Sequence, residues 1–165
     1  MIGSDIAKEL RVYKRILVPI DGSATAGLGL REAVKLAKSL GAQVRLIHIM
    51  NQTPWVTPDA PSTTIARMVD ELRGFAESIL HEATRAVRGA DVEVDSRLIE
   101  AFGAEAGEYI IDEARSWPAE LIVCGTHGRR GLRRMVMGSD AEYILRRSPV
   151  PVLLVRGAEV AERPS

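Results

Sequence analysis

Cysteine, aromatic side chains and net charge are all scarce in this chain. Cys124 is the only cysteine among 165 residues, so no internal disulfide can form, and one cysteine with three scattered histidines offers no metal-type cluster. Aromatic residues make up 4% of the chain, which disfavours a site that stacks the bases of single-stranded nucleic acid. The cysteine usage indicates a reducing compartment.

Long apolar runs are also missing. No run approaches the ~20 residues that cross a bilayer, and the charged stretch from Met1 to Tyr13 lacks the apolar centre of a secretory signal. Lys+Arg and Asp+Glu both number 22, giving a formal net charge of zero, which argues against a general nucleic-acid or membrane-surface binder. We therefore expect a soluble cytoplasmic protein with no membrane partner, and nucleic acid is not an expected partner.

Short apolar segments alternate with helical patterns along the chain, as in successive βα units. This order predicts a single α/β domain, a doubly wound, mainly parallel five-stranded sheet with helices on both faces. The predicted strands are Ile16 to Ile20, Val44 to Ile49, Asp91 to Leu98, Leu121 to Cys124, and Val152 to Val155. Helices are expected at 24–40, 65–87, 105–116 and 140–147, with a long proline-containing loop from Asn51 to Thr64.

The composition of each strand predicts its place in the sheet. The first and fourth are continuous apolar runs, typical of central strands buried on both faces. The third alternates polar with apolar residues and should lie near an edge. The fifth, Val152 to Val155, is apolar with no helix after it, so we expect a homodimer in which this exposed strand meets a second copy.

The stretch Gly125-Thr126-His127-Gly128 is followed after nine residues by Gly138-Ser139, between an apolar strand and an amphipathic helix. Glycines let the backbone approach a ligand, and the free N–H groups at a helix start attract anions. The pattern predicts a phosphate loop, with His127 within reach of phosphate or ribose and Arg129 among the arginines that can neutralise phosphates. A purely structural loop of caps and turns, with solvated arginines, is the alternative.

Asp21 follows the first strand and would flank the same crevice if the first and fourth strands are neighbours. It can accept hydrogen bonds from a ribose, lie near a metal, or simply cap the next helix. No Gly-x-Gly-x-x-Gly follows the first strand and no P-loop motif occurs, which disfavours the usual dinucleotide fold and P-loop NTPases.

Three segments together resemble the universal stress protein family. They are Ile16 to Ser23 (ILVPIDGS), Gly125 to Ser139 (GTHGRRGLRRMVMGS) and Ser148 to Val155 (SPVPVLLV). The resemblance runs from Lys14 to Arg156. It implies a family domain at 14–156, with an N-terminal extension at 1–13 and a C-terminal tail at 157–165.

The resemblance implies a strand order of 3-2-1-4-5, a homodimer across the fifth strand, and ATP as the ligand. It implies a stress-linked binding or signalling role, with slow hydrolysis or none. Carried over to this chain, Asp21 contacts the ribose and Ile49 lies by the adenine, while Cys124 and Gly125 approach the sugar and phosphates. The phosphates would be held by Gly128, Gly138 and Ser139.

Asp140 is an unfavourable residue at an ATP site, because its carboxylate repels a triphosphate. It is favourable in the first turn of a helix, and with Mg²⁺ it can instead help to hold a nucleotide.

Three functions stay open. The leading one is an ATP-binding dimeric stress-response module that signals to unidentified protein partners; the others are a nucleotide-free interaction protein and a slow ATP-hydrolysing enzyme, for which no catalytic residue is identified.

Overall fold

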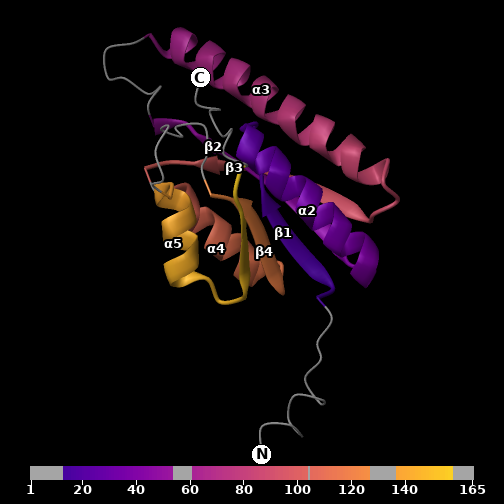
Figure 1. The fold of residues 1–165 in the computed structure, drawn as a ribbon. Coiled ribbons are helices and arrows are strands. Elements are labelled where there is room, and N and C mark those ends of the chain that lie inside the picture. Colours follow the sequence, from indigo (N-terminus) through magenta and orange to yellow (C-terminus); the bar gives the residue numbers. More distant parts are fainter. Residues whose placement is uncertain (1–12, 54–60, 104, 127–136, 158–165) are drawn as a thin grey trace, which may run out of the picture.

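The computed structural model describes residues 13–53, 61–103, 105–126 and 137–157. Its centre is a five-stranded parallel sheet in the order β3-β2-β1-β4-β5, which confirms the predicted fold class and strand order (Figure 1). The strands are β1 (Arg15–Pro19), β2 (Gln43–Asn51), β3 (Val94–Ala101), β4 (Leu121–Gly125) and β5 (Val152–Val155). The helices are α2 (Ala24–Leu40), α3 (Ser62–Arg88), α4 (Ala106–Ser116) and α5 (Ser139–Arg147).

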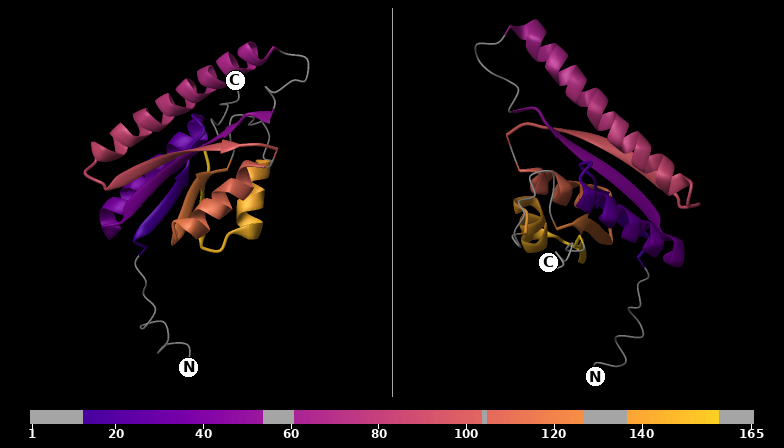
Figure 2. Two further views of the ribbon diagram at one scale, coloured as in Figure 1. Left: turned by 180° about the vertical axis from the view of Figure 1, so that it is seen from behind. Right: turned by 45° about the horizontal axis from the view of Figure 1, so that its top comes forward.

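Helices cover both faces of the sheet, as the alternating pattern predicts (Figure 2). On one face α2 lies against β1 and β4, and α3 lies along β2 and β3. On the other face α4 and α5 pack side by side. Each face has its own apolar core, one around Val18 and Leu46 and the other around Leu17 and Ile122. None of the described helices is long and apolar enough to cross a membrane.

Strand positions agree with the reading of their composition. β1 is central and its Ile16, Leu17 and Val18 are fully buried, while β4 is an inner strand. β3 and β5 are the two edges, as predicted. Continuous apolar residues therefore mark strands that bury both faces, since an inner parallel strand has helices above and below it.

Small residues bring α2 close to the sheet. Its buried positions are Ala26, Gly29, Ala33 and Ala37. A Cβ added at Gly29 would lie 3.3 Å from the backbone of Cys124 and Gly125, closer than ordinary contact. The start of α2 is thus pressed against the carboxyl end of β4, where the candidate site begins.

Several predicted bounds differ from the observed ones, most clearly at the third strand and at the loop after the second. The third strand begins at Val94 and not at Asp91, because Asp91 adopts a left-handed φ of 57° in the turn that ends α3. The predicted loop from Asn51 to Thr64 is shorter at both ends, since β2 extends through Asn51 and α3 begins at Ser62. Pairing of Asn51 with Ala101 lengthens β2, a tertiary contact that no local pattern encodes.

Candidate functional site

The candidate site lies at the carboxyl ends of β1 and β4, which pair directly in the sheet. From this pair the chain winds outward to β2 and β3 on one side and to β5 on the other. Such a reversal leaves a crevice outside the strand ends, where open α/β sheets bind ligands. The structure therefore brings the segment after Ile20 and the segment after Gly125 to the same edge, as the sequence predicts.

The first segment forms a tight turn around Asp21. One carboxylate oxygen, Oδ1, accepts a hydrogen bond of 2.9 Å from the Ser23 backbone N–H, and Gly22 takes a positive φ of 81° between them. Ser23, and not Asp21, is the N-cap of α2, with its Oγ accepting from the Ala26 N–H at 3.2 Å. Asp21 thus positions the cap, and it stays half-buried at the strand end.

The second segment joins β4 to α5. The Gly138 N–H donates to the Thr126 carbonyl oxygen at 3.0 Å, which ties the start of α5 to the end of β4. Gly138 is the N-cap, and no side chain caps this helix, so Ser139 is the first helical residue and not the cap that its residue type suggests. The first-turn N–H groups of a helix lack partners within it, and here they lie beside the carboxyl end of β4.

Two further predicted residues contribute packing. Cys124 is 4% exposed in the core on the α4 side, and burial raises the pKa of its thiol to about 12. A Cβ added at Gly125 would lie 2.7 Å from the carbonyl carbon of Thr25, so glycine is required there by the approach of α2. The backbone of these residues reaches the strand end, whereas the thiol is held as a neutral apolar group.

Ile49 lies on the α4 side of the sheet, half-buried and level with Ile99 of β3. It stands two residues before the end of β2, next to the strand that leads into Asp21. His48, its neighbour, faces the other core and is 5% exposed, with Nδ1 2.8 Å from the Ile20 carbonyl oxygen. This confirms the prediction that His48 is a hydrogen-bonded core histidine.

His127, Gly128 and Arg129 lie outside the described residues, as do the other arginines of the glycine loop. The structure places the two ends of that loop, Thr126 and Gly138, within one hydrogen bond of each other. Of the predicted site residues it brings Asp21, Ile49, Cys124, Gly125, Gly138, Ser139 and Asp140 to the carboxyl edge of the sheet.

Asp140 has a contact that neither reading of the sequence foresaw. Its Oδ1 accepts a hydrogen bond of 3.3 Å from the backbone N–H of Gly107, in the first turn of α4. The two helices meet closely there, since a Cβ at Gly107 would lie 2.8 Å from the Tyr143 ring. The carboxylate therefore satisfies a free N–H at the start of one helix while standing in the first turn of another.

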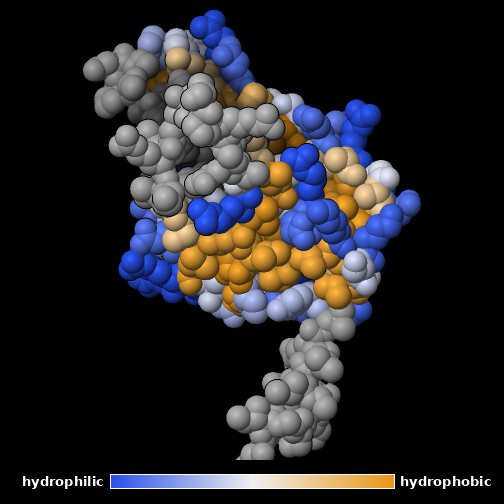
Figure 3. Space-filling model, in the orientation of Figure 1, coloured by the Kyte–Doolittle hydropathy of each residue, from blue (hydrophilic) through white to orange (hydrophobic). Residues whose placement is uncertain are grey.

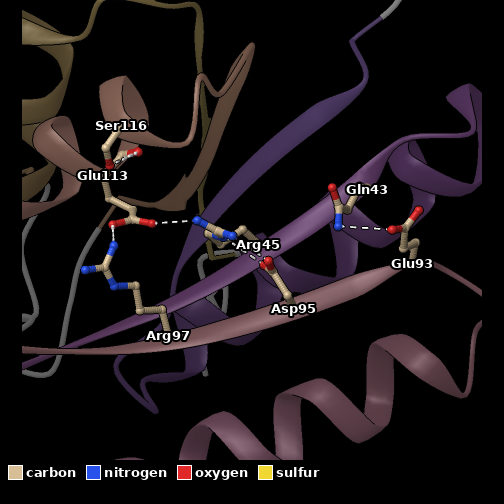
Figure 4. Close-up of polar contacts among 7 residues, drawn as sticks. All are labelled: Gln43, Arg45, Glu93, Asp95, Arg97, Glu113 and Ser116. Carbon is tan, nitrogen blue, oxygen red and sulfur yellow. Dashed lines mark hydrogen bonds and ion pairs between the residues drawn. The ribbon is translucent and has the colours of Figure 1, made fainter.

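A charge cluster around buried Glu113 lies farther down the α4 face (Figure 4). Glu113 is 4% exposed and accepts from Arg45 at 2.9 Å and from Arg97 at 2.7 Å. Arg45 also donates to Asp95 at 2.8 Å, the bond that most raises its pKa, and it stacks on Trp117 with 4.6 Å to the ring centroid. This cluster was not predicted from the sequence, although a lone arginine inside the apolar second strand is a signal for it.

In the part of the chain that the structure describes, no group of three or more His, Cys, Asp or Glu residues could hold a metal ion. Asp140 accepts from Gly107 through Oδ1, which leaves its second carboxylate oxygen as a possible ligand for Mg²⁺.

The geometry defines a class: a doubly wound α/β protein whose winding reverses between β1 and β4, with the start of α5 at the same edge of the sheet. A model of the universal stress protein family matches residues 12–156. The chain belongs to the universal stress protein family.

Individual relatives agree with this membership. The chain is 29% identical over 157 residues to a universal stress protein of Methanocaldococcus jannaschii, covering 94% of this chain and 89% of the relative. A putative universal stress protein of Staphylococcus epidermidis is 31% identical over 151 residues, covering 91% and 88%. Among solved structures, the universal stress protein UspA from Lactobacillus plantarum superposes with a TM-score of 0.77 at 25% identity, covering 88% of this chain and 99% of that chain.

Some solved relatives carry nucleotides. One is a universal stress protein in complex with cAMP, at 21% identity and a TM-score of 0.62. Another, from Archaeoglobus fulgidus, is in complex with dAMP, at 24% identity and a TM-score of 0.60. At these identities the likeness establishes the shared fold.

Proposed function

We propose that this protein binds an adenine nucleotide at the carboxyl edge of its sheet and acts as a binding and signalling module in the stress response. The observation that carries the proposal is the Gly138 to Thr126 hydrogen bond of 3.0 Å, which sets the start of α5 beside the ends of β4 and β1. A helix start offers free N–H groups and a positive dipole to phosphate. Relatives with AMP, cAMP and dAMP support the choice of ligand class.

Each part of the nucleotide has a proposed partner. Ile49 would contact the adenine, since it is the apolar residue near the end of β2, and Asp21 would accept from the ribose hydroxyls. Asp21 is suited to this because the turn to Ser23 already fixes its carboxylate. The phosphates are assigned to the following residues: Gly125, His127, Gly128, Arg129, Gly138 and Ser139. Cys124 would approach the sugar only through its backbone, since its thiol is buried in the core.

ATP with Mg²⁺ is the particular ligand that we propose within this class. Three phosphates extend from the ribose toward the start of α5, and Mg²⁺ would offset the repulsion between them and Asp140. The role is binding, with no catalytic residue assigned, and the single buried thiol is in keeping with a reducing, cytoplasmic setting.

A homodimer through β5 is part of the proposal. β5 is an edge strand with Leu153 36% exposed, and Leu145 of neighbouring α5 is 45% exposed. Figure 3 shows apolar surface over β5 and beside α5. The opposite edge, β3, carries Asp95, Arg97 and Glu100, charges that oppose pairing with another sheet. The uncharged edge is therefore the one suited to a second copy.

Calorimetric titration with ATP and Mg²⁺, and separately with AMP, tests nucleotide binding once mass spectrometry shows that no nucleotide co-purifies. We expect saturable binding that is lost in Gly138→Glu, because the new carboxylate repels phosphate at the start of α5. Gly74→Glu is the matched control: Gly74 is exposed on α3 with nothing within 4 Å of an added Cβ. Absence of binding in the folded wild type would leave the nucleotide-free interaction protein as the function.

A further inference from the structure

Thr126 is joined to two elements with different proposed roles. Its backbone N–H donates to the Val155 carbonyl oxygen at 3.1 Å, at the end of β5. Its own carbonyl oxygen accepts from the Gly138 N–H at 3.0 Å, at the start of α5. The residue is only 7% exposed. A short hydrogen-bonded path therefore runs from the strand at the proposed dimer edge to the helix start at the proposed phosphate site.

The position of Thr126 is restrained by the packing of the preceding residue, Gly125. Gly125, the residue before it, pairs with Val155 in the sheet and lies so close to α2 that a Cβ would be 2.7 Å from the carbonyl carbon of Thr25. Close-packed contacts of this kind transmit displacement and do not absorb it. A shift of Thr126 caused at Gly138 is thus passed to the end of β5 and not taken up within β4.

β5 is the element most sensitive to such a shift. It has four residues, and within the described chain its hydrogen-bonded neighbour is β4. A short edge strand is held weakly, so its order depends on the contacts at its ends and on whatever pairs with its free edge. Ordering of Thr126 by a ligand would order one end of β5, and pairing with a second copy would order the same strand from the other side.

We propose that nucleotide binding at the start of α5 and pairing of two copies through β5 favour each other, with the backbone of Thr126 as the connection. The inference rests on the proposed function and adds its regulation. When two binding events order the same backbone, the second loses less conformational entropy than the first. The coupling is reciprocal: nucleotide strengthens the dimer by the factor by which dimerisation strengthens nucleotide binding.

The first test measures the dimer dissociation constant by analytical ultracentrifugation, without nucleotide and with saturating AMP or ATP and Mg²⁺. We expect the constant to fall about five-fold or more, the lower end of typical coupling between sites. The variant Leu153→Asp places a charge on β5 and should be monomeric. We expect it to bind AMP more weakly than the wild-type dimer, by the same factor by which nucleotide lowers the dimer dissociation constant. Phe75→Asp is the control: Phe75 is 49% exposed on α3, and its variant should match the wild type.

A second test separates the path through Thr126 from any other. Gly138 has φ −64° and ψ 149°, so proline fits its backbone and removes only the N–H that donates to Thr126. Alanine adds a Cβ and keeps that N–H. Because Gly138 is itself assigned to phosphate, both variants should bind nucleotide more weakly than the wild type, so the quantity compared is the coupling factor, the ratio of nucleotide affinities of dimer and monomer. We expect this ratio to approach one in Gly138→Pro and to persist in Gly138→Ala. Hydrogen exchange of the Thr126 amide should slow on nucleotide addition in the alanine variant and stay unchanged in the proline variant.

The outcomes are distinguishable. Saturable binding by a dimer whose dissociation constant is unchanged by nucleotide overturns the coupling and leaves the proposed function standing. Equal coupling factors in the proline and alanine variants overturn the role of Thr126. A wild type that binds no nucleotide in direct titration overturns the proposed nucleotide binding together with the coupling. A wild type that binds nucleotide but stays monomeric at every concentration overturns the homodimer and the coupling, and leaves nucleotide binding standing.

Discussion

The carboxylate of Asp140 accepts a hydrogen bond of 3.3 Å from the backbone N–H of Gly107, so the first turns of α5 and α4 are joined by one side chain. Both helices begin at the carboxyl edge of the sheet (Figure 1). This contact fixes the start of α5, the element assigned to phosphate, against its neighbour. It gives Asp140 a structural reason to be there with or without a ligand.

Replacing Asp140 with alanine should lower the free energy of unfolding by about 1 kcal/mol, since a helix start loses its acceptor and a first-turn charge disappears. Urea denaturation measures the change. Glu142→Ala is the control in the same helix: it loses a pair with Arg146, an exposed contact of a type that contributes about 0.5 kcal/mol or less. If Asp140→Ala instead leaves stability unchanged and removes the effect of Mg²⁺ on ATP affinity, the carboxylate is a metal ligand.

Glu113→Ala should destabilise the fold by about 2 kcal/mol, chiefly because Arg45, whose side chain is 21% exposed, loses its buried acceptor. Arg97 contributes less to the loss, since its side chain is 58% exposed and can be hydrated. Thermal and urea unfolding report the loss. The adjacent Asp112→Ala is a matched control: Asp112 is 75% exposed and pairs only with exposed Arg115 among the described residues, so its removal should change stability by under about 0.5 kcal/mol. Equal effects of the two substitutions would contradict a structural role for the cluster.

Gly125→Ala should destabilise the protein by about 1–3 kcal/mol, as overpacking does, because the added Cβ meets the Thr25 backbone at 2.7 Å. Gly74→Ala, where a Cβ has nothing within 4 Å, should stabilise α3 by up to about 1 kcal/mol. Chemical denaturation of the two variants compares them directly. A Gly125→Ala protein as stable as the wild type would show that α2 can move away from β4.

The Cys124 thiol should resist alkylation in the folded protein at pH 8, because burial raises its pKa to about 12. In the unfolded chain the thiol has its usual pKa of 9.0. Between about pH 9 and about pH 12 the unfolded chain has therefore lost a proton that the folded protein retains. Stability therefore falls as pH rises through this window, by up to about 1.4 kcal/mol per unit. Cys124→Ala should unfold with a shallower dependence on alkaline pH, and rapid labelling of the native wild type would contradict burial.

The order of strands and helices could be predicted from the sequence because apolar residues are spaced differently in strands and in helices. α2 was predicted at 24–40 with the observed bounds, and the edge position of the third strand followed from its polar alternation. The start of that strand was missed by three residues, because Asp91 takes a left-handed φ in the hydrogen-bonded turn that ends α3. The loop after the second strand was predicted to begin too early, since its first end is fixed by the long-range pairing of Asn51 with Ala101.

The sequence by itself determined which residues reach the carboxyl edge of the sheet, because in a parallel βα order every strand points its end to the same side. Tertiary structure alone decided what those residues touch there. Asp140 meets Gly107, Gly125 meets Thr25, and Glu113 gathers two arginines from β2 and β3. Such contacts join positions from 16 to 100 residues apart in the chain, so they depend on how whole helices pack on the sheet, which no local period encodes.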